Sequence, residues 1–327
     1  VMSDVETFGI DLNAAAAVIV DLTSMSGIST IDVTSGEQAT LTIKNIGTET
    51  INIAELVSHA SNKVDLQLVS ETGKSDSITI KSGAANTDAN SGIVTTNIET
   101  VNFNVDNALS FDAVGITMTE AAGETAGSNK VKIVASGDSA FTLKALHADL
   151  SDLDASALTG AMVITAASSS ATNITGGSAG DTLLGGAAAD VIIGGGGADD
   201  ITGAAGLDTL TGGAGVDTFN IAVESSKFIF DTITDIADGD IIAVGNKGIE
   251  TFTTAAKTLS GDAALSDFLD LAAAGTGGGT NGVFTWFNYG GNTFIVQDQT
   301  NAAIFTVATD MVVKLTGVHD LSLSDVG

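Results

Sequence analysis

Apolar and polar residues alternate over short stretches in the first half of the chain, as in Leu41–Ile43 and Val131–Ile133. This period of two, bounded by Gly, Ser, Asn and Asp, predicts β-strands. A helical period is visible only at Ser110–Met118. Residues 1–165 are therefore expected to form a β-rich structural domain, as a solenoid or a sandwich. Many short strands are predicted, and examples are Ala16–Leu22, Ser29–Thr34, Ala39–Ile46, Lys63–Val69, Ser77–Lys81, Val101–Val105, Lys130–Val134 and Ala140–Leu146.

A repeat of nine residues then replaces the simple alternation. From Gly176 the successive units are GGSAGDTLL, GGAAADVII, GGGGADDIT, GAAGLDTLT and GGAGVDTFN. Six residues of each unit suit a turn and three suit a short strand, so two units would make one coil of a parallel roll over residues 166–222. Asp recurs at 181, 190, 199, 208 and 217, followed two positions later by Leu183, Ile192, Ile201, Leu210 and Phe219.

The pattern changes again in residues 223–327, which are expected to form a small β-rich cap with one helix. DTITDIADGDIIAV predicts two strands around an acidic turn. Ser260–Ala274 predicts a helix capped by Ser260 or Asp262. VFTWFNYGGNTFIVQD predicts a hairpin that turns at Gly290–Asn292. Its aromatic residues Trp286, Phe287 and Tyr289 are more typical of a packed hairpin core than of a carbohydrate-binding platform.

Composition and charge exclude several classes of function. The chain has 40 acidic and 11 basic residues, and its formal net charge is −29. Such a charge excludes ordinary nucleic-acid binding, which needs a coherent basic face. Cys is absent, so there is no disulfide or thiolate metal site. No apolar run approaches the 18 residues or more of a membrane span, so membrane insertion is not expected.

The repeat carries the strongest chemical signal. Strands in adjacent coils lie about 4.8 Å apart, so the Asp residues on one side would stack at that spacing. At an effective dielectric of about 20, two unit charges at this distance repel by roughly 3.5 kcal/mol. No Lys or Arg lies between Lys144 and Lys227. A divalent cation would relieve the repulsion, and the carboxylate and carbonyl donors favour Ca²⁺ over Mg²⁺ and Zn²⁺.

Residues 176–220 resemble the repeats-in-toxin (RTX) β-roll, whose repeat is GGxGxDxUx. The resemblance implies calcium between turns one coil apart, held by two Asp side chains and four backbone carbonyls. It implies one site at Asp181 and Asp199 with carbonyls of Gly177, Ala179, Gly194 and Gly196. It implies a second at Asp190 and Asp208 with Gly186, Ala188, Gly203 and Ala205, and a third at Asp199 and Asp217 with Gly195, Gly197, Gly212 and Ala214.

The sequence departs from the family pattern at Ala179, Ala188 and Ala204, where Gly is usual. A positive φ costs energy at Ala, so the first two turns are expected to bind calcium more weakly. Weaker metal candidates follow the repeat at Asp231, Asp235 and Asp240. Acidification toward the ordinary Asp pKa of about 4 is expected to release calcium and melt the roll.

The flanking segments extend the resemblance with less specificity. The closing GGNTFIVQD and VVKLTGVHDLSLSDVG are similar to the C-terminal regions of bacterial proteins exported by type I secretion. IETVNFNV and LDASALTG are similar to surface-layer (S-layer) proteins and large adhesins of that class. The resemblance implies an extracellular location at the bacterial surface, self-assembly into an oligomer or lattice, and the type I secretion apparatus as a partner.

Motifs of catalysis are missing from the sequence. HExxH does not occur, no GxSxG or P-loop pattern follows one of the predicted strands, and the three His residues are far apart. His147 stands near Asp149, Asp152 and Asp154, where a solvated acidic turn is the better interpretation than a metal site. The sequence thus predicts a non-enzymatic calcium-binding structural protein, an S-layer subunit. A calcium-binding RTX adhesin segment and the C-terminal tail of a secreted hydrolase remain as alternatives.

Overall fold

A computed structural model describes the chain in twenty segments. They are residues 6–12, 18–24, 30–35, 39–44, 50–55, 64–69, 77–82, 92–96, 98–111, 116–119, 131–144, 150–166, 169–222, 229–244, 251–252, 255–260, 262–274, 283–297, 304–306 and 310–321. The chain divides into two compact units, Val1–Leu183 and Leu184–Gly327. Each is described by itself.

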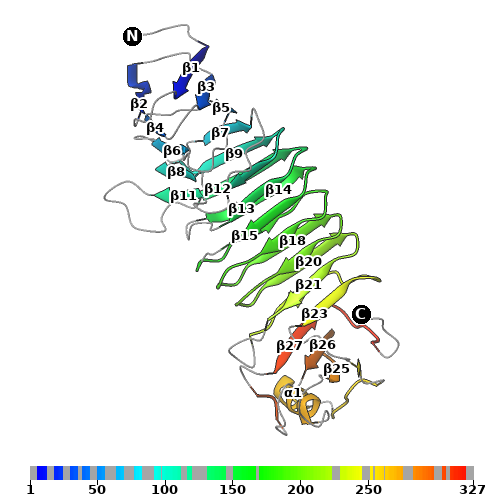
Figure 1. The fold of residues 1–327 in the computed structure, drawn as a ribbon. Helices are drawn as coiled ribbons and strands as arrows, with labels where there is room; N and C mark the ends of the chain where they lie inside the picture. The colour runs from blue at the N-terminus through cyan, green and yellow to red at the C-terminus, as the bar shows by residue number, and fades with distance from the viewer. Residues whose placement is uncertain are drawn as a thin grey trace. The chain divides into compact units, whose positions relative to one another are not determined.

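Three parallel sheets build the first unit (Figure 1). One contains β1 (Thr7–Leu12), β3 (Thr30–Ser35), β5 (Thr50–Glu55), β7 (Ser77–Ser82), β9 (Thr100–Val105), β12 (Val131–Gly137), β14 (Leu150–Leu158) and β16 (Asn173–Thr175). The second contains β10 (Leu109–Phe111), β13 (Phe141–Lys144), β15 (Met162–Thr165) and β17 (Thr182–Leu184). The third contains β2 (Val18–Asp21), β4 (Ala39–Lys44), β6 (Val64–Val69), β8 (Gly92–Thr96) and β11 (Ile116–Thr119), and a short 3-10 turn covers Leu22–Ser24.

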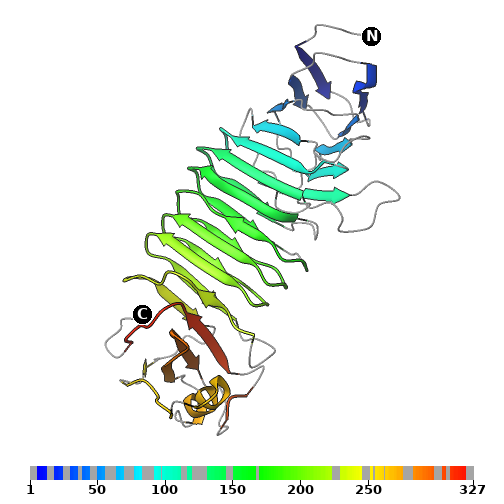
Figure 2. The ribbon, with the colours of Figure 1, turned by 180° about the vertical axis from the view of Figure 1, so that it is seen from behind.

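Chain order and pairing identify this unit as a parallel β-solenoid, one of the two architectures that the sequence left open. The chain passes from one sheet to another and returns to pair in parallel with a strand it left one coil earlier, as β7 does with β9 and β9 with β12. Figure 2 shows the same strands from behind. The described residues of Ser110–Met118 are not helical: they belong to β10 and β11, so the apparent helical period was misleading.

The core of the first unit is a column of inward-facing side chains. In β9 the burial alternates residue by residue, and Val101, Phe103 and Val105 are buried. The Phe103 ring packs against Phe111 and Phe141, with ring centroids 5.9 and 5.0 Å away. Side chains of three strands therefore meet in one layer, as a period of two requires when a solenoid encloses a narrow core.

The second unit begins with the roll and ends with a cap (Figure 1). One of its sheets follows the order β18-β20-β22-β27-β26-β25-β24, and another follows β19-β21-β23. The roll and its continuation consist of β18 (Val191–Gly196), β19 (Asp200–Thr202), β20 (Thr209–Ala214), β21 (Thr218–Ile221), β22 (Thr232–Ile233) and β23 (Ile241–Val244). The cap consists of β24 (Thr251–Phe252), α1 (Leu265–Ala274), β25 (Val283–Tyr289), β26 (Asn292–Gln297) and β27 (Met311–Leu315).

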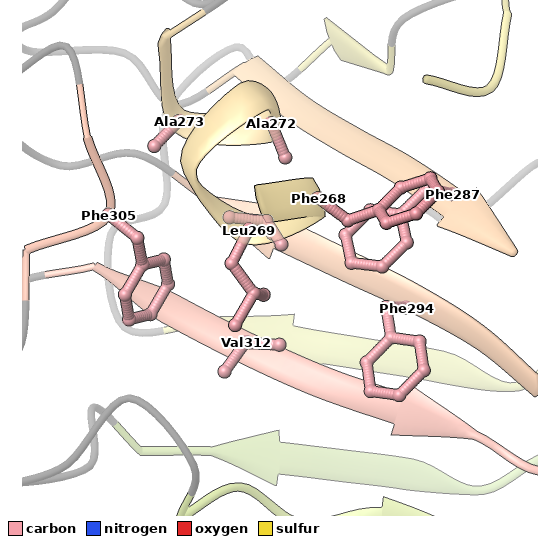
Figure 3. Close-up of a cluster of buried hydrophobic side chains, with 9 residues drawn as sticks. Phe268, Leu269, Ala272, Ala273, Phe287, Phe294, Phe305 and Val312 are labelled. Atoms are coloured by element: carbon pink, nitrogen blue, oxygen red, sulfur yellow. The ribbon is translucent and has the colours of Figure 1, made fainter. Parts of the chain in front are cut away.

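The cap has its own aromatic core beneath α1 (Figure 3). Phe268 of α1 stacks on Phe287 of β25 at 5.1 Å, and Phe287 stacks on Phe294 of β26 at 5.3 Å. Trp286 and Phe287 are almost fully buried. The hairpin aromatics are therefore core residues, as the sequence favoured, and the predicted turn is present at Gly290 and Gly291, whose φ angles of 58° and 80° are left-handed.

The helix begins later than predicted. α1 starts at Leu265 rather than at Ser260, because its first turn is closed by Asp267, whose Oδ2 accepts a hydrogen bond from Ala264 N at 2.9 Å. Neither Ser260 nor Asp262 is therefore the cap that the sequence predicted. An acidic residue in the first turn also suits the positive end of the helix dipole.

The turns of the third to fifth repeats use positive φ at their second and fourth residues. Gly215 has a φ of 143°, and a Cβ there would overlap the Gly197 carbonyl of the preceding coil. The fourth repeat has Ala at its second residue, and Ala204 has a φ of 76°. Ala179 and Ala188 do not adopt positive φ, so the expected strain lies in the fourth turn instead.

Replacing Ala204 by Gly should stabilise the roll. A left-handed φ costs an L-residue about 1–2 kcal/mol in the folded state. Gly avoids this cost, but its greater conformational entropy in the unfolded chain offsets part of the gain. We expect Ala204→Gly to raise the free energy of unfolding by about 1 kcal/mol in urea titrations with chelator present. Ala205→Gly, one residue along at ordinary φ, should lower it. A loss of stability in both variants would show that Ala204 is not strained.

Candidate metal centre

The five Asp residues of the repeat are buried. Their exposed fractions are only 1–2%, although each stands at the end of a surface turn. In every repeat the Asp comes just before a strand, and the apolar residue two positions later points into the core with 0% exposure. The alternation of the strand thus fixes the side-chain direction of Asp: Asp181, Asp190, Asp199, Asp208 and Asp217 all face inward with their apolar partners.

Within the second unit, each pair of Asp residues one coil apart is joined by a hydrogen bond. Asp190 N donates to Asp208 Oδ1 at 2.7 Å, and Asp199 N donates to Asp217 Oδ1 at 2.9 Å. In the first unit, Asp181 Oδ1 accepts from Met162 N at 2.7 Å. Carboxylates and backbone amides therefore alternate along the coils, and the two Asp pairs predicted within the second unit are brought together.

The first Gly of the repeat makes room for the carboxylate. A Cβ on Gly194 would overlap Asp199 Oδ2, and one on Gly212 would overlap Asp217 Oδ2. In the second to fifth repeats the carboxylate therefore packs against the bare Cα of the glycine that opens its own turn. In the first two repeats the same oxygen also accepts a hydrogen bond from the second Gly, from Gly177 N to Asp181 Oδ2 at 2.7 Å and from Gly186 N to Asp190 Oδ2 at 2.6 Å.

Burial raises the pKa of the carboxylates of Asp181, Asp208 and Asp217. The pKa of Asp208 is raised to about 6, chiefly because burial disfavours its charged form. The Asp190 N–H opposes this rise in pKa, the negative charge of Asp190 adds to it, and a hydrogen bond shared with the Asp231 carboxyl opposes it. Burial likewise raises the pKa of Asp181 and of Asp217.

The donor set fits a hard cation. Asp208 Oδ2 is buried and receives no hydrogen bond from the described residues. The described residues contain no group of three or more His, Cys, Asp or Glu that could hold a metal by side chains alone. A cation at an Asp pair would therefore need backbone carbonyls as well, and oxygen-only ligation of this kind suits Ca²⁺.

Two of the predicted carbonyl ligands take part in coil-to-coil hydrogen bonds. Gly186 O accepts from Ala205 N at 3.2 Å, and Ala214 O accepts from Gly197 N at 2.8 Å. A carbonyl oxygen has two lone pairs, so these bonds leave capacity for a cation. The assignment of individual carbonyls stays a prediction.

The weaker candidates after the repeat divide into two kinds. Asp231 and Asp240 are only 1% and 6% exposed, although they flank an acidic turn whose Asp238 is exposed. Asp235 lies elsewhere: its carboxylate accepts from Gly212 N at 2.9 Å and from Gly213 N at 2.8 Å, so it caps the turn of the fifth repeat. Sequence reasoning did not separate these roles, although Asp231-x-Ile233 and Asp240-x-Ile242 repeat the pattern of the nonapeptide nine residues apart.

Outside the roll, other candidate chemistry is accounted for by structure. Lys132 Nζ lies 3.2 Å from Asp152 and 3.3 Å from Asp154, so those carboxylates pair with a cation already present. His147 and Asp149 lie outside the described residues. No helix in the described part of the chain is long and apolar enough to cross a membrane.

We expect the metal-free protein to be more stable at pH 5 than at pH 8. A raised folded-state pKa contributes stability below the unfolded pKa of about 4, and this is lost as pH rises through about 6. Ionisation of Asp208 alone should lower the free energy of unfolding by up to about 3 kcal/mol. Urea unfolding in chelator across this range checks it, and Asp208→Asn should flatten the profile. Stability that rises with pH in the metal-free protein would contradict the burial argument.

This prediction modifies what the sequence indicated about acidification. Protons and calcium compete for the same carboxylates, so release of calcium should begin near pH 6 rather than pH 4. The protonated Asp residues no longer repel one another, so loss of calcium at pH 5 should not by itself melt the roll.

Comparison with known proteins agrees with this geometry. The family model described as "RTX calcium-binding nonapeptide repeat (4 copies)" matches residues 175–210 and 199–220. A comparison with curated proteins found no match. The matched residues are those that form the buried Asp pairs and the glycine-opened turns. Residues 175–220 are therefore RTX calcium-binding nonapeptide repeats, and in this chain they form part of a parallel β-roll.

Proposed function

We propose that this protein is a non-enzymatic structural protein of the bacterial surface, an S-layer subunit that folds and assembles with calcium. The observation that carries the proposal is the column of buried carboxylates in the roll. Asp190 with Asp208 and Asp199 with Asp217 would hold ions between coils of the second unit. Bound calcium supplies the positive charge that lets both carboxylates of a pair stay ionised at neutral pH.

Folding would then depend on the compartment. Where calcium is scarce, ionised Asp residues cannot be buried at coil spacing without repulsion, so the roll is destabilised and the chain stays competent for export by a type I secretion apparatus. Where calcium is abundant, the ligands of the folded roll are satisfied. Binding to the folded state alone stabilises it in proportion to the logarithm of calcium concentration.

The first unit supports a structural role rather than catalysis. Its described strands form a solenoid whose inward positions carry side chains such as Ile133, Phe141 and Leu143, while polar residues face outward. A solenoid of this kind presents long, regular faces that suit lateral packing. The same architecture suits the stalk of an adhesin, which remains the second candidate, and the tail of a secreted hydrolase is the third.

Self-assembly requires charge to be neutralised. A chain at −29 repels its copies at long range. Three ions in the roll would add six positive charges and leave a net charge of about −23, so ions outside the roll are needed for lateral packing. We expect assembly to require more calcium than folding does.

A calcium titration of the chelated chain tests the proposal. Far-UV circular dichroism follows folding, and light scattering follows particle size. We expect β-structure to appear first and large particles at higher calcium, both reversed by chelator. Asp199→Asn keeps the size of the side chain and removes its charge, and it should raise the calcium midpoint of folding by at least about tenfold. Asp138→Asn, at an exposed position, is the matched control and should not shift the folding midpoint.

The outcomes separate the candidates. Ordered two-dimensional arrays under the electron microscope at millimolar calcium would support an S-layer subunit. A folded, monodisperse monomer at millimolar calcium would reject self-assembly and favour the adhesin or the hydrolase tail. A chain whose circular dichroism and stability ignore calcium would overturn the calcium-dependent mechanism altogether.

A further inference from the structure

The roll does not end with the fifth repeat. β20 pairs with β22 in a register that places Thr209 opposite Thr232, and β21 pairs with β23 with Thr218 opposite Ile241. The residues just before these strands are Asp208 and Asp231 in one case and Asp217 and Asp240 in the other. Within the repeat, Val191 opposite Thr209 and Asp200 opposite Thr218 relate Asp190 to Asp208 and Asp199 to Asp217 in the same way.

The hydrogen bonds confirm this equivalence. Asp208 N donates to Asp231 Oδ1 at 3.3 Å, and Asp217 N donates to Asp240 Oδ1 at 2.9 Å. Bonds of the same kind, from the amide of one Asp to the carboxylate of the Asp one coil later, join Asp190 to Asp208 and Asp199 to Asp217. Asp231 and Asp240 therefore occupy the Asp position of one further coil, although Asp231 comes 23 residues after Asp208 instead of 18.

The two further Asp pairs bring buried carboxylates close together. Asp208 is only 1% exposed, and its Oδ2 accepts no hydrogen bond from the described residues. The Asp231 carboxylate reaches the same turn, because its Oδ1 accepts the hydrogen bond from Asp208 N. On the other side of the roll, the buried Asp217 has Asp235 and Asp240 as negatively charged neighbours. Both new pairs thus bring buried carboxylates together where an intervening cation would remove their repulsion.

We propose that the roll binds two further calcium ions beyond the nonapeptides, one between Asp208 and Asp231 and one between Asp217 and Asp240. The proposal rests on the proposed calcium-dependent function of the roll and extends it by one coil. Asp208 and Asp217 each become a ligand shared by two ions, one on either side. The matched family segment ends at residue 220, so neither new site is part of it.

Asp235 caps a turn in this coil. Its carboxylate accepts hydrogen bonds from the amides of Gly212 and Gly213, so a side chain from the following coil holds the turn of the fifth repeat. In contrast, Asp240 Oδ2 accepts a hydrogen bond from Ala237 N at 2.7 Å within its own turn. Asp181 and Asp190 likewise accept a hydrogen bond from an amide of their own turn. The acidic segment therefore contains two ligand positions, Asp231 and Asp240, and one capping position.

Native mass spectrometry of the full chain in calcium counts the bound ions directly. Asn keeps the Oδ1 acceptor for the Asp208 and Asp217 amides, so Asp231→Asn and Asp240→Asn preserve the hydrogen bonds and remove the charges. We expect each variant to bind one ion fewer than the unaltered chain, and the double variant two fewer. Asp238→Asn is the matched control, because Asp238 is exposed in the same turn, and it should bind the full number.

A second measurement separates ligation from a purely structural role. Calcium should raise the urea midpoint of the unaltered chain more than that of either variant, whereas a structural role would lower the midpoint equally with and without calcium. Unchanged ion counts for both variants, with Asp199→Asn still losing calcium, would overturn this inference and leave the proposed function intact. Absence of bound calcium in every protein would overturn both. If Asp231→Asn does not fold in calcium, the ion count of Asp240→Asn decides.

Discussion

Burial of like charges at coil spacing is the constraint on which the roll depends. A nine-residue unit can reverse the chain and supply one inward apolar side chain only if the residue two positions earlier also faces inward, and that residue is Asp. In the second to fifth repeats the carboxylate is accommodated by a glycine Cα in its own turn, and Asp208 and Asp217 also accept a hydrogen bond from an amide of the adjacent coil. These hydrogen bonds leave the charge of Asp208 uncompensated, as its raised pKa shows.

The cap illustrates how such a roll can end. The parallel edge at β22 is not left open, because β27 pairs with it from a distant part of the chain and is followed in the sheet by the antiparallel strands β26 and β25. An uncovered parallel edge is a template for aggregation. The aromatic core under α1, with Phe287 stacked between Phe268 and Phe294, holds these strands in place.

Much of this architecture was visible in the sequence, because periods of two and nine leave direct marks. Several strands of the first unit, such as β7 and β9, were predicted from local pattern, and so were the roll and the Gly290–Gly291 hairpin. Long-range facts were not. The return of β27 to β22 has no local signature. Asp231 and Asp240 were predicted only as weaker metal candidates, because five residues beyond the regular period of 18 precede Asp231 and shift it out of phase with the repeat. The start of α1 depended on Asp267, a side chain inside the predicted helix.

The central claim is that cations sit between the Asp pairs of the roll. Anomalous diffraction from crystals grown in calcium, recorded at a long X-ray wavelength where calcium scatters anomalously, locates such ions without reference to any model of the ligands. The account predicts peaks between Asp190 and Asp208 and between Asp199 and Asp217, each with carboxylate and carbonyl oxygens around it. Well-ordered roll turns without anomalous peaks, and with the carboxylates bonded only to backbone amides, would contradict it.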